Sequence, residues 1–295
     1  MQLTAMNPDP SLPLPISSFA CREDPDDDAI RQFQREVLAF YHGHGRHDMA
    51  WRHTTNPYRI VVSELMLQQT QVERVAIKFP AFIAAFPDFA ALAAAPLHEI
   101  LAVWQGMGYN RRALFLKKIA ESVLKDYNGV LPQDVETLAT LPGIGTATGS
   151  SIAAFAFNAP VVFIETNIRR VYIHVFFCHH ETVTDKEILP LVERTLYREN
   201  PRVWYWALMD LGAFLKKSVA NPNRRSAHYT RQAPFEGSDR RIRGLILKTL
   251  VTGSCMKEDE LSGHIGEDDG RVKRNVAALE QEGFVVREGG HVYLR

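Results

Sequence analysis

Apolar residues recur every three or four positions through most of this sequence, and this period constrains the fold more than any other feature. Phe33, Val37, Leu38 and Tyr41 mark the first such segment, which begins at about residue 29. A repeat close to 3.6 residues predicts amphipathic helices. Similar patterns predict helices over about 57–70, 72–86, 96–103, 111–125, 134–140, 146–156, 167–178, 186–199 and 201–216.

Short runs that contain glycine or proline separate these segments. Phe86-Pro87-Asp88, Gly106-Met107-Gly108 and Asn128-Gly129 are examples, and such residues interrupt a helix or form a turn. No stretch alternates apolar and polar residues over a useful length before about residue 284. The sequence therefore predicts an all-α body.

The last part of the chain follows a different pattern. Three short helical patterns precede two apolar runs, 284–287 and 291–294, which flank Gly289-Gly290. Apolar runs on either side of paired glycines predict a β-hairpin. Three helices followed by a hairpin is the order of a winged helix, so we expect a small winged-helix domain over 239–295.

Two other segments lack helical periodicity. Residues 1–28 are rich in Pro, Ser and Asp, a composition that predicts a disordered acidic tail. Residues 218–238 carry several basic side chains and no apolar period, and we interpret them as a basic linker. The main helical domain would then span 29–217.

Charge and composition exclude few classes of protein. The sequence holds 34 Lys and Arg and 34 Asp and Glu, so the total charge gives no support for nucleic-acid binding, although local patches could still provide it.

No apolar stretch is long enough for a membrane span, and no secretory signal is visible. Cys21, Cys178 and Cys255 lie far apart. We expect a cytoplasmic, nucleoid-associated protein without structural disulfides.

The run Leu141-Pro142-Gly143-Ile144-Gly145-Thr146 lies between two predicted helices. Glycines allow a tight turn and the close approach of a ligand. The following helix N-terminus offers free N–H groups to a phosphate. The sequence thus predicts a hairpin that binds the DNA backbone through Leu141, Gly143, Gly145 and Thr146, and an ordinary turn with a helix cap is the alternative.

Two acidic residues stand in environments that suit catalysis. Glu64 lies within an apolar helical segment, where a carboxyl group keeps its proton more easily and can act as a general acid. Glu165 follows four apolar residues at the start of a predicted helix, where the helix dipole favours the ionised form. A solvated or paired helix residue for Glu64, and a simple capping acid for Glu165, are the alternatives.

Together these stretches resemble the helix-hairpin-helix glycosylases of the endonuclease III superfamily. The resemblance covers about residues 45–217 and is nearest to the adenine DNA glycosylase (MutY) family. It is carried by four stretches: Ser63–Val72, Trp104–Tyr109, Leu141–Gly145 and Met209–Ala213. It implies a helix-hairpin-helix fold with two helical subdomains.

The resemblance also implies roles in catalysis. Glu64 matches the glutamate that protonates the departing adenine. Glu165 falls where the family places an aspartate that stabilises the oxocarbenium-like sugar, and Asn167 matches an asparagine that orients this carboxylate. One proton donor and one carboxylate address the two ends of an N-glycosidic bond, once the base is flipped out of the duplex.

Other residues are expected at the DNA. Tyr109 matches a tyrosine that wedges into the base stack, and Gln68 and Gln69 match residues that line the DNA interface, where an amide can meet a base edge. We also expect three basic residues to bind DNA: Arg170, Arg224 and Arg225.

The chain departs from the family in four places. Glu165 replaces the usual aspartate, and Ala147 stands where bifunctional members carry a lysine, so a Schiff base is not expected. No cysteine lies between Cys178 and Cys255, where the family binds an iron–sulfur cluster, so we expect no cluster. We also do not expect the C-terminal domain with which the resembled family inspects 8-oxoguanine. The hairpin at 141–146 is a candidate site for a monovalent cation.

The sequence therefore predicts a monofunctional DNA N-glycosylase of base excision repair. Its expected partner is double-stranded DNA with a mismatch or an oxidised base, and its expected substrate is adenine opposite 8-oxoguanine or guanine. We expect no membrane partner and a monomer. The alternatives are a glycosylase for thymine or uracil opposite guanine, since one fold serves several bases, and a non-catalytic winged-helix regulator that binds DNA.

Overall fold

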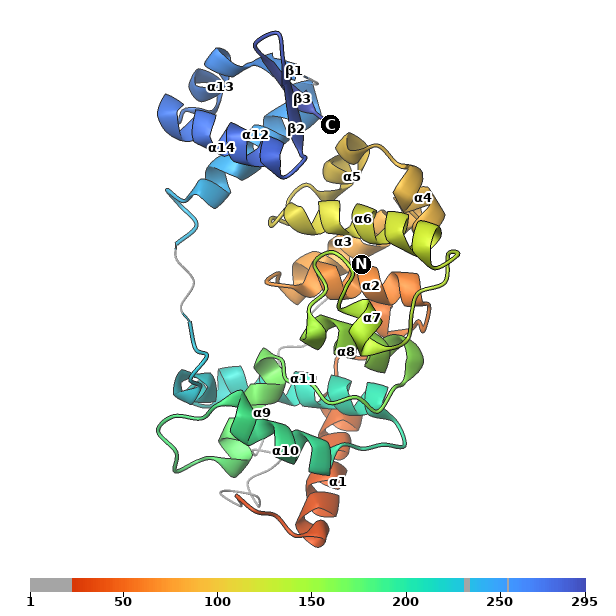
Figure 1. Cartoon of the computed structure of the whole chain (residues 1–295). Coiled ribbons are helices and arrows are strands. Elements are labelled where there is room, and N and C mark those ends of the chain that lie inside the picture. The colour runs from red at the N-terminus through yellow and green to blue at the C-terminus, as the bar shows by residue number, and fades with distance from the viewer. Residues whose placement is uncertain (1–22, 231–233, 254) are drawn as a thin grey trace. The chain divides into compact units, whose positions relative to one another are not determined.

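The computed structural model describes residues 23–230, 234–253 and 255–295 (Figure 1). The chain divides into two compact units, and the division falls within α2 (Pro57–Leu67). The first unit takes its described residues from 23–60, 133–140 and 144–230, and the second from 61–132, 141–143 and the C-terminal residues from 234 onward.

The first unit is built from helices. They are α1 (Asp27–His44), η2 (Ala50–Arg52), α7 (Val135–Leu138), α8 (Thr146–Phe157), α9 (Thr166–Phe176), α10 (Asp185–Thr195), α11 (Pro201–Ser218) and η3 (Pro222–Arg225). An aromatic cluster joins three of them. The ring of Phe33 on α1 meets Tyr172 and Phe176 on α9 and Trp204 on α11 edge to face, with centroids 5.1–6.0 Å apart. Burial of such large rings stabilises the unit.

Gly212 allows α9 and α11 to pack closely. A Cβ atom at this position would lie only 2.3 Å from the backbone oxygen of Asn167, which is inside any allowed contact. Residue 212 must therefore be glycine for the N-terminal turn of α9 to rest on α11. The same turn carries the acidic residue that the sequence analysis places in the site.

The second unit contains a helical part and a C-terminal module. The helical part holds α3 (Val72–Ala85), α4 (Phe89–Ala94), α5 (Leu97–Trp104) and α6 (Arg111–Asp126), with Phe82 and Trp104 packed edge to face in its core. The module, residues 239–295, consists of α12 (Asp239–Gly253), β1 (Cys255–Lys257), α13 (Glu258–Ile265), α14 (Asp269–Gln281), β2 (Val285–Glu288) and β3 (His291–Leu294).

The strands of the module form one antiparallel sheet in the order β1-β3-β2. In β2 and β3, Val285 pairs with Leu294 and Glu288 with His291, around the glycine pair that the sequence analysis identified. Strand β1 pairs with the other edge of β3 and was not expected. The winged-helix assignment stays a prediction.

Several boundaries differ from the sequence analysis. Most of the expected acidic tail, residues 1–22, lies outside the described residues. Helix α1 begins at Asp27, because the side chain of Asp26 accepts a hydrogen bond from the N–H of Ala29 and caps it. Helix α4 was missed because only six residues form it. Cys178 is disulfide-bonded, so the expectation of no disulfide is wrong; its partner lies outside the described residues.

The expected linker is partly ordered, so its boundary at 218 is wrong. Residues 222–225 form η3, in which Pro222 and Asn223 are buried. Just beyond it, the N–H of Ala227 donates to the carbonyl of Val183 at 2.9 Å, and the N–H of Val183 donates to the carbonyl of Arg225 at 2.7 Å. This segment belongs to the first unit, and residues 231–233 lie outside the described residues.

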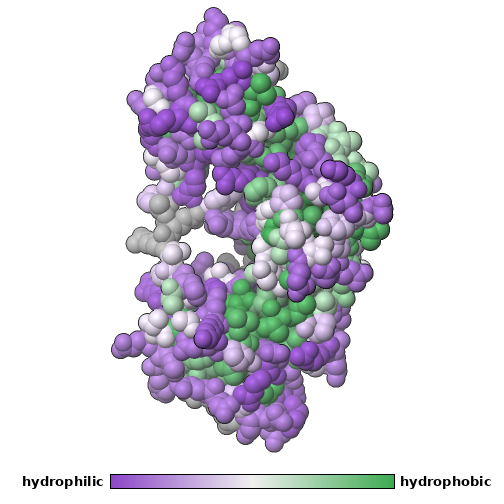
Figure 2. All heavy atoms as spheres, in the orientation of Figure 1, coloured by the Kyte–Doolittle hydropathy of each residue, from purple (hydrophilic) through white to green (hydrophobic). Residues whose placement is uncertain are grey.

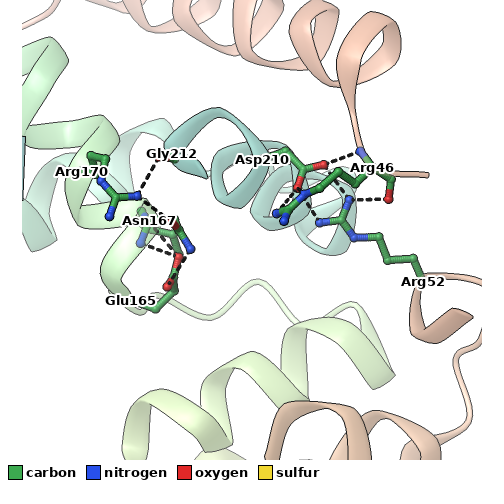
Figure 3. Close-up of polar contacts among 8 residues, drawn as sticks. Arg46, Arg52, Glu165, Asn167, Arg170, Asp210 and Gly212 are labelled. Atoms are coloured by element: carbon green, nitrogen blue, oxygen red, sulfur yellow. Dashed lines mark hydrogen bonds and ion pairs between the residues drawn. The ribbon is translucent and has the colours of Figure 1, made fainter. Parts of the chain in front are cut away.

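Asp210 on α11 binds two arginines that precede α2 in the chain. Its carboxylate accepts hydrogen bonds from Arg46 Nε at 2.7 Å and from Arg52 Nη1 and Nη2 at 2.7 and 2.9 Å (Figure 3). The side chains of Asp210 and Arg52 are only 2% and 5% exposed. Although burial raises the pKa of Asp210, Arg52 and Arg46 together hold it below its ordinary value.

We expect Asp210→Asn to lower the free energy of unfolding by about 3–5 kcal/mol, because it leaves the buried charge of Arg52 without its partner. Urea unfolding at pH 7 measures this. A carboxyl group whose pKa is lowered by folding stabilises the protein above the unfolded pKa of about 3.9. The contribution is lost as the pH falls through the folded value, so the two proteins should converge in acid.

The control for this experiment is Asp24→Asn. Asp24 also pairs with an arginine, Arg194, but 90% of its side chain is exposed, and exposed pairs contribute little. An Asp210 variant no less stable than the Asp24 variant would show that the buried pair does not hold the unit together.

Candidate active site

Glu165 is the N-cap of α9. Its Oε1 accepts hydrogen bonds from the backbone N–H groups of Asn167 at 2.8 Å and Ile168 at 3.1 Å. Its Oε2 accepts a longer bond, 3.3 Å, from the side-chain amide of Asn167. The carboxylate therefore turns back onto the first turn of its own helix, where the N–H groups have no partner within the helix.

Arg170 fixes the orientation of the Asn167 amide. Its Nη1 donates to Asn167 Oδ1 at 2.7 Å and to the carbonyl of Gly212 at 2.7 Å (Figure 3). Because Oδ1 accepts from Arg170, the NH₂ end of the amide faces Glu165. The structure thus brings Glu165 and Asn167 together, as the sequence analysis expects, and adds Arg170 and Gly212 to the arrangement.

Burial raises the pKa of the Glu165 carboxyl above its ordinary value. This rise in pKa is only partly offset by the N–H groups of Ile168 and Asn167 and by the charge of Arg170, which favour the ionised carboxylate. The direction of the shift is therefore opposite to the one that the capping position alone predicts, because desolvation outweighs the helix N-terminus here.

The segment around η3 supports α9 from the other side. The side-chain amide of Asn223 donates to the carbonyl of Thr166 at 2.8 Å, and Arg170 Nε donates to Asn221 Oδ1 at 3.2 Å. Arg225 donates to the carbonyls of Ile173, Phe177 and His180 around the C-terminal end of the helix. Residues first interpreted as linker thus contact both ends of α9.

These contacts correct two of the expected DNA contacts. Arg170 is buried, with 3% of its surface exposed, and its guanidinium binds Asn167, Asn221 and Gly212. Arg225 is half-buried and binds backbone carbonyls of the first unit. Neither guanidinium is directed to an external phosphate, whereas Arg224 is exposed and its expected role stays a prediction.

Glu64 lies near the end of α2, between two fully buried residues. Ser63 and Leu65 are 1% and 0% exposed, and Glu64 itself is half-buried. The helix ends at Leu67; Gln68 is half-buried and Gln69 is exposed with φ of 54°. A left-handed backbone is uncommon for glutamine and is held by its surroundings.

Tyr109 closes a turn between α5 and α6 and also has a left-handed backbone, with φ of 47°. Gly106 and Gly108 in this turn have φ of 85° and 67°, which explains the glycines of the motif. The Tyr109 hydroxyl accepts a hydrogen bond from Arg240 on α12 at 2.8 Å. The sequence analysis did not foresee this contact with the module.

Arg112 is a residue that the sequence analysis missed. It lies on α6, is 5% exposed, and binds both the end of α2 and the turn that precedes Tyr109. The sequence carries no signal that Arg112 is buried. The helical period predicts buried positions only where the residues are apolar.

The residues of the hairpin differ in their exposure to solvent. Gly143 has φ of 75°, and a Cβ there would lie 2.2 Å from the ring of Phe115 on α6, so glycine is required. Leu141 is buried, which leaves only its backbone for the expected DNA contact. Gly143, Gly145 and Thr146 are exposed, and Gly145 is the N-cap of α8. Their DNA contacts stay predictions.

Most basic side chains of the module are paired with acids. Glu282 binds Arg243 of α12 and Arg111 of α6, with N–O distances of 2.7 and 2.6 Å. Arg271 pairs with Asp239, and Lys273 with Asp259 and Asp269. The visible face of the module is mainly hydrophilic (Figure 2), but these pairs reduce the charge available for phosphates.

Two features are absent from the residues that the structure describes. Within them, no helix is both long and apolar enough to cross a membrane. No group of three His, Cys, Asp or Glu side chains in the same part of the chain is placed to hold a metal ion. The segment around η3, where the family binds its cluster, contains no cysteine and does not fit that group.

The chain is similar to proteins of known activity. The family described as "HhH-GPD superfamily base excision DNA repair protein" matches residues 62–194. An adenine DNA glycosylase from Mycolicibacterium smegmatis is 35% identical over 232 residues, which are 73% of this chain and 79% of that protein. A thymine/uracil-DNA glycosylase from Pyrobaculum aerophilum is 30% identical over 167 residues, covering 56% of this chain and 70% of that protein.

Two solved structures share the fold. A thermostable thymine-DNA glycosylase superposes with a TM-score of 0.55 and 27% identity, over 62% of this chain and 86% of that one. Endonuclease III in a non-covalent DNA complex superposes with a TM-score of 0.50 and 20% identity, over 72% of this chain and 91% of that one. The fold predicted from the sequence for the helical body is thereby confirmed.

We expect the Glu165 carboxyl to titrate above the ordinary range of a glutamate. In Arg170→Gln it should titrate at a still higher pH, because the charge of Arg170 favours the carboxylate. Carbon-13 NMR of the side-chain carboxyl groups measures both values, and Glu165→Gln assigns the signal by removing it.

Arg169→Gln is the matched control for this titration. Arg169 is the neighbouring arginine but pairs with Asp185, with an N–O distance of 2.6 Å, so its loss should leave the titration of Glu165 nearly unchanged. An unchanged titration in Arg170→Gln would contradict the coupling.

Proposed function

Because the chain belongs to the adenine DNA glycosylase family, within the HhH-GPD superfamily of base excision DNA repair proteins, it is a DNA N-glycosylase, and we propose that its substrate is adenine mispaired with 8-oxoguanine or guanine. The observation that carries the proposal is a retained pair of acids: Glu64, half-buried in apolar α2, and Glu165, oriented by Asn167.

Glu64 is proposed to be the general acid. Cleavage of an N-glycosidic bond leaves negative charge on the departing base, and a proton delivered in the transition state removes this charge. Glu64 is half-buried, and fully buried residues precede and follow it in α2. The proton passes from Glu64 to the base as the bond to the sugar breaks.

Glu165 is proposed to stabilise the sugar. The sugar gains positive charge as the base leaves, and a fixed carboxylate lowers the energy of that state. Asn167 and the first N–H groups of α9 hold the carboxylate in place, so little reorganisation is needed. Water then attacks the sugar carbon, and the proton that it loses replaces the one that Glu64 gave up, which completes the hydrolysis.

The reaction is proposed to end at base removal, without a covalent intermediate on the enzyme. Ala147, on α8, stands where a lysine nucleophile would be needed, and its methyl group cannot attack the sugar. We also propose that no iron–sulfur cluster takes part, since the segment between Cys178 and Cys255 supplies no thiolate.

Removal of thymine or uracil opposite guanine is the second candidate. It is favoured by the similarity to the thymine/uracil-DNA glycosylase and by the fold shared with the thymine-DNA glycosylase. Several bases can be served by one fold, because the base pocket and not the scaffold sets the choice.

A base-release screen tests the proposal. Under single-turnover conditions, duplexes with adenine opposite 8-oxoguanine or guanine, and with thymine or uracil opposite guanine, are compared for base loss. We expect adenine release. Release of thymine or uracil alone would establish the second candidate, and tight binding without release of any base would point to a non-catalytic regulator.

We expect Glu64→Gln to reduce the single-turnover rate of base release by about 10²- to 10⁴-fold, because the amide has similar shape but no proton to donate. Binding to the same duplex, measured by fluorescence anisotropy, should persist. Glu73→Gln is the control, since Glu73 is an exposed acid in the first turn of α3 and should release base normally.

We expect Glu165→Gln to lose most base release, because a neutral amide cannot offset the positive charge on the sugar. Glu165→Asp is more informative. If the longer side chain is needed to reach the N–H groups of α9, the aspartate should also be slower; a rate equal to the wild type would reject that dependence on length and leave the role of the charge in place. The same single-turnover assay measures both.

A further inference from the structure

Arg112 is a buried arginine whose recorded hydrogen-bond acceptors are backbone carbonyls and one hydroxyl. Nη1 donates to the carbonyls of Leu65, Met66 and Gln68 at 2.8, 2.7 and 2.6 Å. Nη2 donates to the Thr70 hydroxyl at 2.9 Å and to the carbonyls of Met107 and Gly108 at 3.3 and 3.0 Å. One planar group therefore joins two loops distant in sequence.

The first loop is the end of α2. The last carbonyls of a helix have no partner within the helix, and here those of Leu65 and Met66 bind the guanidinium. The positive charge also suits the negative end of the helix dipole. Arg112 thus ends the helix that carries Glu64 and binds the residues on both sides of Gln69, through the carbonyl of Gln68 and the hydroxyl of Thr70.

The second loop is the turn before Tyr109. Arg112 binds the carbonyls of the two residues that precede this tyrosine, and its guanidinium carbon lies 5.5 Å from the centre of the Tyr109 ring and 5.2 Å from that of Trp104. A cation over an aromatic face is attracted to it. Arg112 therefore contacts both the ring of Tyr109 and the backbone that precedes it.

Gln69 and Tyr109 share an uncommon backbone. Both are non-glycine residues with left-handed φ, 54° and 47°. Such conformations persist only where the surroundings impose them, and they gather at functional sites. Arg112 binds the carbonyl that precedes each of them, Gln68 and Gly108, so the same side chain holds the backbone next to both.

Burial disfavours the charged form of Arg112. It lowers the pKa of Arg112 to about 10, so the group is still charged at neutral pH while its recorded acceptors are neutral. A helix cap alone could be made by water or a neutral side chain. An arginine fork is suited to hold several carbonyls in a fixed plane, and this favours a role in geometry.

We propose that Arg112 is a positioning residue that holds Gln69 and Tyr109 in fixed relation for the step in which the target base leaves the duplex. This rests on the proposed function and on the expected DNA contacts of Gln69 and Tyr109. Arg112 does not touch the substrate; it acts through the two loops. Its loss should impair extrusion of the base more than cleavage of the glycosidic bond.

The test compares Arg112→Lys with the wild type. Lysine keeps the charge but cannot form the planar fork, and Arg112→Met removes both. Each variant is first checked by circular dichroism and urea unfolding, and only folded protein is compared. Arg202→Lys is the matched control, because Arg202 also donates to backbone carbonyls, those of Phe155 and Ala156 at the end of α8, in the other unit.

Two substrates separate extrusion from cleavage. In one, adenine is opposite guanine; in the other, adenine is opposite an abasic-site analogue, so no pair has to be broken. We expect Arg112→Lys to slow single-turnover release from the first by about 10- to 100-fold, the effect of a small misplacement, and from the second by less than about threefold. Arg202→Lys should leave the ratio of the two rates unchanged.

Equal losses on both substrates, or no loss on either, would overturn the positioning role. A second measurement does not depend on catalysis: 2-aminopurine at the target position brightens when it leaves the stack. We expect this signal to be slower and smaller with Arg112→Lys than with the wild type or Arg202→Lys. If the wild type releases no base, the proposed function fails, but the fluorescence comparison still decides for or against Arg112.

Discussion

The close contact of α9 with α11 at Gly212 is the constraint on which the candidate site depends. No side chain fits between the residue 212 backbone and Asn167, and the carbonyl of Gly212 accepts a bond from Arg170. Arg170 in turn donates to Asn167 Oδ1 and so orients this amide toward Glu165. Two residues earlier in α11, Asp210 binds Arg46 and Arg52. One helix thus positions the acidic cap of α9 and anchors the segment before α2.

Buried arginines connect the parts of each unit. The buried Arg112 and Arg170 and the half-buried Arg225 donate mainly to backbone carbonyls and amide oxygens, so their hydrogen bonds are made within the protein instead of to a phosphate. The module behaves similarly at its surface, where Glu282 pairs with Arg243 and with Arg111 of α6. This explains why a count of basic residues gives a poor measure of DNA binding here, as the total charge of zero already indicates.

The sequence predicted the helical body well because strong 3.6-residue periodicity reports burial directly. A carboxylate before a helix start left a local signal at Glu165, whereas Asn167 was expected from the resemblance alone, and the catalytic roles of both stay predictions. Arg112 and η3 could not be found in this way. Both depend on partners distant in sequence, and a polar side chain gives no periodic signal of burial. Arg170 and Arg225 were misplaced for the same reason: a charge pattern does not distinguish a buried hydrogen-bonded arginine from an exposed one.

Glu165, where the resemblance predicts an aspartate, caps α9 mainly through one of its two oxygens. Oε1 accepts both backbone N–H groups of the first turn. Oε2 accepts only the longer bond from Asn167 and retains most of its capacity to interact with a positive charge. If Glu165 stabilises the sugar, Oε2 is the oxygen that does so. The cap and the proposed catalytic charge would then lie on separate oxygens of one carboxylate.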